Sequence, residues 1–89
     1  MMKRDEVLVN LRKAQSHLAK VITMVEDGKY CIDIMQQQLA VIGLLKSAHQ
    51  MLMASHLNHC FKEAVGTDDD ARKQQMVEEI LTVTKLANR

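Results

Sequence analysis

Apolar residues recur at steps of three and four near the start of the chain, which is the spacing that places them on one side of an α-helix. This stripe predicts an amphipathic helix over about residues 3–26. Gly28, in the sequence "EDGKY", is suited to ending that helix. The apolar positions of the stripe are Val7, Leu11, Ala14, Leu18, Val21 and Val25.

The stretch that follows, residues 32–64, contains no helix breaker other than Gly43 and predicts one long second helix. Next comes "VGTDDDA", which has the composition of a loop. Thr67 or Asp68 in this loop is expected to cap a third helix that reaches about Leu86. The pattern therefore predicts an all-α fold, a three-helix protomer with a long central helix, in a single domain over residues 1–89.

Composition adds a reason to expect self-association. The 89 residues include no proline, three glycines and only two aromatic residues, so the chain favours helices but has little bulk for a core. Such a chain is expected to oligomerise. The net charge of +1 excludes neither nucleic acid nor protein as a partner. The sequence shows no signal peptide and no apolar run of membrane-spanning length, so we expect a cytoplasmic protein without a membrane partner.

The two cysteines, Cys31 and Cys60, lie near opposite ends of the predicted central helix. At the rise of an α-helix they are about 44 Å apart in one chain. His56 and Cys60 are four residues apart, so they share a helix face and could ligate one ion. A third ligand would come from Cys31 of an antiparallel partner helix. The two-fold axis of such a dimer would lie near Gly43. This geometry predicts a dimer with two equivalent sites between subunits.

The donor set of this predicted site favours one metal. In a reducing compartment two cysteines are more typical of free thiols, metal ligands or redox sensors than of a structural disulfide. Two thiolates and one imidazole form a soft, three-coordinate set that suits Cu(I). Zinc prefers a fourth ligand, and nickel or cobalt prefer more nitrogen or oxygen donors. A purely structural role stays open, because a lone cysteine often packs as a small apolar residue.

The sequences "HLAKVITMVEDGKYCIDIMQQ" and "MLMASHLNHCF" resemble the CsoR/RcnR family of small bacterial metal-sensing repressors, over residues 10–61 and more loosely beyond. Cys31, His56 and Cys60 are of the types found at these positions in the copper-sensing branch. The resemblance implies antiparallel dimers that pair into tetramers. It also implies that the metal-free protein binds operator DNA and that Cu(I) releases it.

The resemblance further implies that Tyr30 and Glu79 join a hydrogen-bond network with the ligating histidine, although Glu78 stays possible. An outer partner of this kind would fix the orientation of the imidazole. Other histidine and methionine side chains are expected to have structural or surface roles and not to bind the metal. His49 and Met53 are expected in the core, and His59 and His17 on the surface.

Operator binding is where the sequence departs from the family. Copper-sensing members generally carry arginines at the positions of Asn10 and Ser47. The family's Arg-Gly before the histidine reads Gln15-Ser16 here. A basic stripe is nevertheless present, and phosphate contacts need only positive charge. The candidate DNA-binding residues are Arg12, Lys13, His17, Lys20 and Lys46.

These observations predict a Cu(I)-responsive, homo-oligomeric transcriptional repressor that is not an enzyme, since no catalytic constellation is present. Two alternatives stay open. The first is a persulfide or thiol-redox sensor using Cys31 and Cys60, which the presence of His56 disfavours. The second is a copper-binding protein of the same fold that has lost operator binding, which Asn10 and Ser47 favour.

Overall fold

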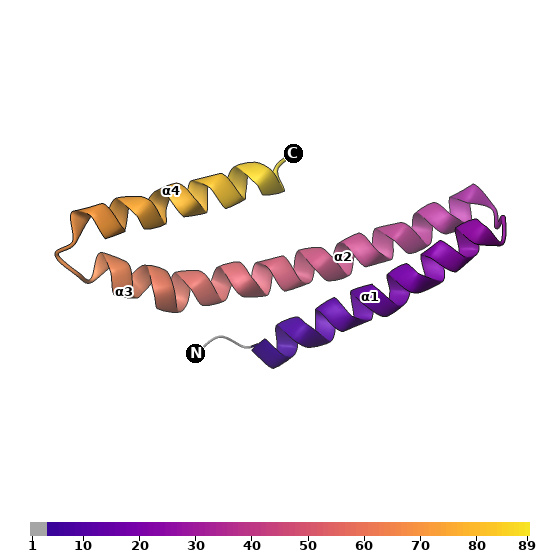
Figure 1. Ribbon diagram of the computed structural model, residues 1–89, viewed down its shortest axis with the longest axis horizontal. Helices are drawn as coiled ribbons and strands as arrows, with labels where there is room; N and C mark the ends of the chain where they lie inside the picture. Colours follow the sequence, from indigo (N-terminus) through magenta and orange to yellow (C-terminus); the bar gives the residue numbers. More distant parts are fainter. Residues whose placement is uncertain (1–3) are drawn as a thin grey trace. The chain divides into compact units, whose positions relative to one another are not determined.

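The computed structural model describes residues 4–89, which form helices and contain no strand. The elements are α1 (Arg4–Glu26), α2 (Cys31–Ser55), the π-helix η1 (His56–Phe61), α3 (Lys62–Val65) and α4 (Asp70–Ala87) (Figure 1). The three predicted helical segments and the all-α class are thereby confirmed. Contacts divide the described chain into two compact units, residues 4–54 and residues 55–89. The prediction of a single domain stays a prediction.

The turn between α1 and α2 follows from one residue. Gly28 has a φ of +67°, a left-handed conformation that residues with a side chain rarely adopt. The N–H of Gly28 donates to the carbonyl of Val25, and the N–H of Lys29 donates to the carbonyl of Met24. These two bonds form the Schellman motif, which satisfies the last carbonyls of a helix. Gly28 therefore ends α1 as predicted, and the chain reverses into α2.

In the unit of residues 4–54, α1 and α2 run side by side in opposite directions (Figure 1). Ala14 and Val21 of α1 and Val41 of α2 form the buried cluster, and Ile34 and Leu44 pack against it. Buried positions recur seven residues apart along each helix, which is the spacing of a single helix–helix seam. They are Val7, Ala14 and Val21 on α1, and Val41 and Ala48 on α2.

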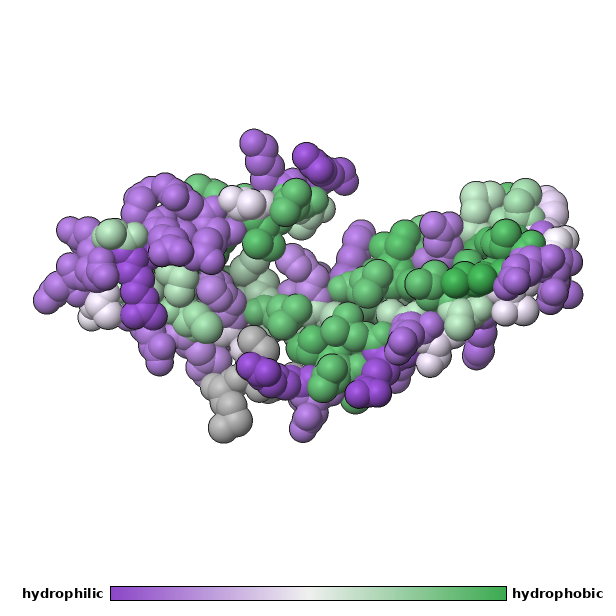
Figure 2. Space-filling view, viewed as in Figure 1, coloured by the Kyte–Doolittle hydropathy of each residue, from purple (hydrophilic) through white to green (hydrophobic). Residues whose placement is uncertain are grey.

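The other half of the predicted α1 stripe stays uncovered. Leu11, Leu18 and Val25 are 39%, 46% and 60% exposed. An apolar stripe this wide can contact two neighbouring helices, and α2 buries only one side of it. Figure 2 shows apolar side chains on the visible surface of the molecule. Exposed large apolar residues of α2 are Ile32, Met35, Leu39, Ile42, Leu45 and Leu52.

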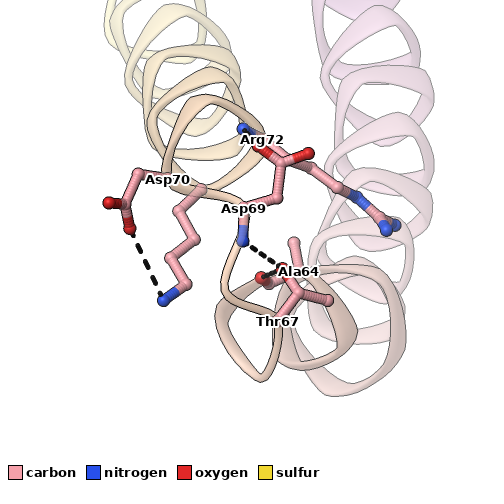
Figure 3. A network of polar contacts seen from close by, with 6 residues as sticks. Ala64, Thr67, Asp69, Asp70 and Arg72 are labelled. Carbon is pink, nitrogen blue, oxygen red and sulfur yellow. Dashed lines mark hydrogen bonds and ion pairs between the residues drawn. The ribbon is translucent and has the colours of Figure 1, made fainter.

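In the unit of residues 55–89, Ala64 of α3 is fully buried, and a short loop leads into α4. The Thr67 hydroxyl donates to the Ala64 carbonyl at 2.7 Å, so it closes the end of α3 (Figure 3). The Asp69 carboxylate accepts from the N–H of Arg72 at 3.0 Å and caps α4. The prediction that Thr67 or Asp68 is the cap was therefore wrong, because α4 begins at Asp70 and the residue directly before it is Asp69. The hydroxyl of Thr67 accepts from the N–H of Asp69 at 3.4 Å while it donates to the preceding helix.

Candidate metal ligands and basic groove

Cys31 is the first residue of α2, and its side chain is a free, exposed thiol. The turn at Gly28 sets its position, because α2 begins three residues later. The carbonyl of Tyr30 accepts from the N–H of Ile34 at 3.2 Å, so the helical hydrogen bonding starts at Tyr30. Cys31 thus lies on a regular first turn, with its sulfur accessible from solvent.

His56 and Cys60 both lie on the π-helix η1, which the sequence did not predict. Ser55 before it and Lys62 after it have helical backbone angles, so the chain stays helical through the whole segment. A π-helix contains one more residue in each hydrogen-bonded ring than an α-helix, and π-helical turns are frequent at functional sites. Positions four apart remain nearly one above the other in this wider turn. The half-buried imidazole of His56 and the exposed thiol of Cys60 therefore share one side of η1.

The described part of a single chain brings no three His, Cys, Asp or Glu side chains together in a group that could hold a metal ion. Cys31 belongs to the unit of residues 4–54, whereas His56 and Cys60 belong to the unit of residues 55–89. Both cysteines are free thiols. One chain thus places His56 and Cys60 on the same short helix η1, and their role as metal ligands together with a Cys31 stays a prediction.

The remaining residues predicted near this site have varied surroundings. His49 and Met53 are half-buried on α2, and His59 is exposed on η1. Tyr30 is 66% exposed. The carboxylate of Glu78 accepts from the side-chain amide of Gln74 at 3.2 Å. The side chain of Glu79, its exposed neighbour on α4, makes no hydrogen bond or ion pair with any described residue.

A basic groove lies along α1 where it faces α2, with a volume of about 590 Å³. Arg12, Lys13 and Lys20 line it with exposed side chains, and His17 is half-buried there. Four of the five predicted DNA-binding residues are therefore collected in one groove, whereas Lys46 does not line it. The other lining residues are Val9, Ser16 and Leu44, so none of the residues that line the groove is acidic.

Two hydrogen bonds between side chains join α1 to α2 beside this groove. The Asn10 amide nitrogen donates to the Ser47 hydroxyl at 2.9 Å, and the pair is partly buried. Nε2 of His17 lies 2.8 Å from the amide oxygen of Gln37. From the sequence alone, Asn10 and Ser47 were notable only because copper-sensing members of the family generally have arginine at these positions. That they bond to each other could not be inferred from a separation of 37 residues in the chain.

Residues 3–85 match the sequence model of a family described as metal-sensitive transcriptional repressors, and the chain belongs to that family. A copper-sensing transcriptional repressor CsoR of Mycobacterium ulcerans is 35% identical over 83 residues, covering 93% of this chain and 68% of its own. The CsoR of Bacillus subtilis is 29% identical over 82 residues, covering 92% and 78%.

A solved structure shares the fold. The crystal structure of the copper-sensing repressor CsoR with Cu(I) from Geobacillus thermodenitrificans matches with a TM-score of 0.85 at 27% identity. The match covers 100% of this chain and 92% of the other. These findings confirm the resemblance drawn from residues 10–61, and a family of repressors agrees with the prediction that the protein is not an enzyme. Within residues 4–89, no helix has both the length and the hydrophobicity of a membrane span.

Proposed function

We propose that this protein is a Cu(I)-responsive transcriptional repressor with Cys31, His56 and Cys60 as its copper ligands. The observation that carries the proposal is this soft donor set in a chain whose relatives are copper-sensing repressors. The donors fit the ion, because thiolate and imidazole groups suit Cu(I) and both thiols are free and exposed. When bound, Cu(I) would supply a single centre that ties these three side chains together.

The complete ligand set is proposed to form between chains, in an antiparallel dimer or a tetramer built from such dimers. Cys31 of one copy would meet His56 and Cys60 of its partner, with the two-fold axis near Gly43. Support comes from the exposed apolar residues of α1 and α2, since large exposed apolar patches mark interaction surfaces. A Cβ built on Gly43 meets no atom of the chain within 4 Å, so a second copy has room to approach there.

Tyr30 and Glu79 are proposed to connect the ligating His56 to the rest of the protein. An imidazole that ligates through one nitrogen normally donates its other N–H to an outer acceptor, which fixes its orientation. Glu79 suits this role better than Glu78, because the carboxylate of Glu78 is already engaged by Gln74. Glu79 lies on α4. A contact between Glu79 and His56 would therefore change the position of α4 when copper binds.

Operator DNA is proposed to bind the groove residues Arg12, Lys13, His17 and Lys20, with Lys46 as a further contact. Lysine and arginine neutralise backbone phosphates, and this supplies much of the affinity of DNA-binding proteins. An oligomer would present the groove several times, which strengthens binding without any new type of contact.

The test is an anaerobic Cu(I) titration of the protein bound to a duplex from its own promoter. We expect the metal-free protein to bind, and one Cu(I) per chain to weaken binding by about 1–3 kcal/mol, the usual size of allosteric coupling. His56→Ala should retain some copper through the two thiolates but lose the effect on DNA. Asn58→Ala, at an exposed position of the same helix η1, is the matched control and should respond like wild type.

Two other functions are separated by the same experiment. A copper-binding protein without operator binding is favoured by the Asn10–Ser47 pair, which replaces two expected arginines by neutral side chains. It predicts tight copper binding and no complex with the promoter duplex even at low salt. A thiol sensor is favoured by the two exposed cysteines. It predicts that persulfide releases DNA equally well from wild type and from His56→Ala, while Cu(I) has no effect on either.

A further inference from the structure

We infer that His17 is a proton-sensitive contact of the basic groove, so that acidification strengthens the binding of operator DNA. The inference rests on the proposed function, since it takes DNA as the partner, and it adds regulation by pH to that site. Its first support is the position of the ring. His17 lies half-buried in the groove, with Lys13 one turn before it and Lys20 one turn after it on α1. A proton on His17 would join the two lysines into a continuous row of three cations.

The second support is the hydrogen bond that the ring makes. Nε2 of His17 lies 2.8 Å from the amide oxygen of Gln37, and an amide oxygen can only accept. Nε2 therefore carries the hydrogen, and Nδ1 of the neutral ring holds the lone pair that takes up a proton. Because Nε2 is the donor to Gln37 in both forms, protonation adds a charge without breaking this contact between α1 and α2. The proton thus changes the charge of the groove and not its shape.

The third support is the set of charged groups around the ring. On α1 the charged groove residues are Arg12, Lys13 and Lys20, all of them cations. From α2, the groove is lined by Leu44, and Gln37 is neutral. None of the residues that line the groove is acidic, so a phosphate of bound DNA is the anion that would stabilise the protonated ring. The titratable residues of α2 all lie outside the groove, and they are Cys31, Asp33, Lys46 and His49.

The sign of the pH effect follows from linkage. A phosphate beside His17 attracts the added charge, so bound DNA favours the protonated ring. By reciprocity, protonation of the ring favours bound DNA by the same factor. Histidine is the side chain whose charge ordinarily changes between about pH 5 and pH 8. The affinity for DNA should therefore rise as the pH falls through this range.

The experiment measures fluorescence anisotropy of metal-free protein with a duplex from its own promoter, from about pH 8 to about pH 5.5. At the lower pH, wild type should bind about fivefold more tightly, which is the effect of an exposed ion pair of about 1 kcal/mol. The slope of log affinity against log salt should steepen by about 1. His17→Gln keeps an N–H for Gln37 but cannot be charged, so it should lose both responses. His49→Gln, which changes a half-buried histidine of α2 outside the groove, is the matched control and should keep them.

Two further measurements separate the charge of His17 from its structural role. His17→Arg carries a permanent charge, so its affinity near pH 8 should match that of wild type near pH 5.5. In wild type, the NMR signal of the His17 Cε1–H should move toward its protonated position when the duplex is added at about pH 6.5. A ring that only holds α1 against α2 would not give this movement.

Each outcome decides the matter. If His17→Gln and wild type respond to pH alike, or if the duplex leaves the His17 signal unmoved, the inference is wrong and the proposed function stands. If the pH response depends on His17 but Cu(I) leaves DNA affinity unchanged, the inference holds and the copper response fails. If wild type binds no duplex at low salt at either pH, both fall.

Discussion

Replacing Gly43 by alanine gives opposite expectations for a lone chain and for the proposed oligomer. Gly43 lies in the interior of α2, exposed, and an added Cβ would meet no atom of the chain within 4 Å. Glycine inside a helix is less favourable than alanine by about 0.8–1.0 kcal/mol. Within a single chain the change should therefore raise the free energy of unfolding by about 1 kcal/mol.

In the proposed antiparallel dimer the same methyl group falls at the closest approach of two α2 helices. The gain in helix propensity is present in paired and unpaired chains alike, so it cancels from the association equilibrium. What remains is the cost of overpacking, typically about 1–3 kcal/mol. The dimer dissociation constant should therefore rise by about five- to 150-fold.

Sedimentation over a range of protein concentrations measures this dissociation constant, and urea unfolding measures the stability. Ala19→Gly, at an exposed position on α1, is the control: it should lose about 1 kcal/mol of helix stability and leave association unchanged. A more stable Gly43→Ala protein that associates as tightly as wild type would refute close helix approach at Gly43. A monomeric wild type at micromolar concentration would refute the oligomer itself.

Three further expectations concern the cysteines and the loop before α4. Mild oxidation of metal-free protein should give a disulfide-linked dimer on a non-reducing denaturing gel, and Cys31→Ala should remain monomeric there. Cys31→Ala and Cys60→Ala should each abolish tight Cu(I) binding in competition with a chromophoric chelator, since two ligands hold the ion poorly; undiminished binding in the double variant would place the copper elsewhere. Asp69→Ala should lower the free energy of unfolding by about 1 kcal/mol in urea, whereas Asp68→Ala should change it by less than about 0.5 kcal/mol; equal losses would contradict the assignment of the cap.

The sequence by itself determined where the helices lie and the types of candidate ligands. Helix periodicity depends on neighbouring residues, so the stripe of α1 and the breaker-free run after it could be read directly. Gly28 could be recognised because few other residues adopt the left-handed turn that it makes. Cys31, His56 and Cys60 stood out because soft ligands are chemically distinctive, wherever the chain places them.

Only the tertiary structure decided which side of each helix is covered and which polar groups meet. Leu11 and Ala14 belong to one stripe, yet α2 buries Ala14 and leaves Leu11 exposed. The Asn10–Ser47 bond depends on how two helices are turned against each other, which no local pattern encodes. The π-helix that carries His56 and Cys60 likewise has no marker in its six residues. Helix propensities differ by fractions of a kcal/mol to about 1 kcal/mol per residue. They are too small to decide which helix faces are buried, so packing between helices decides it.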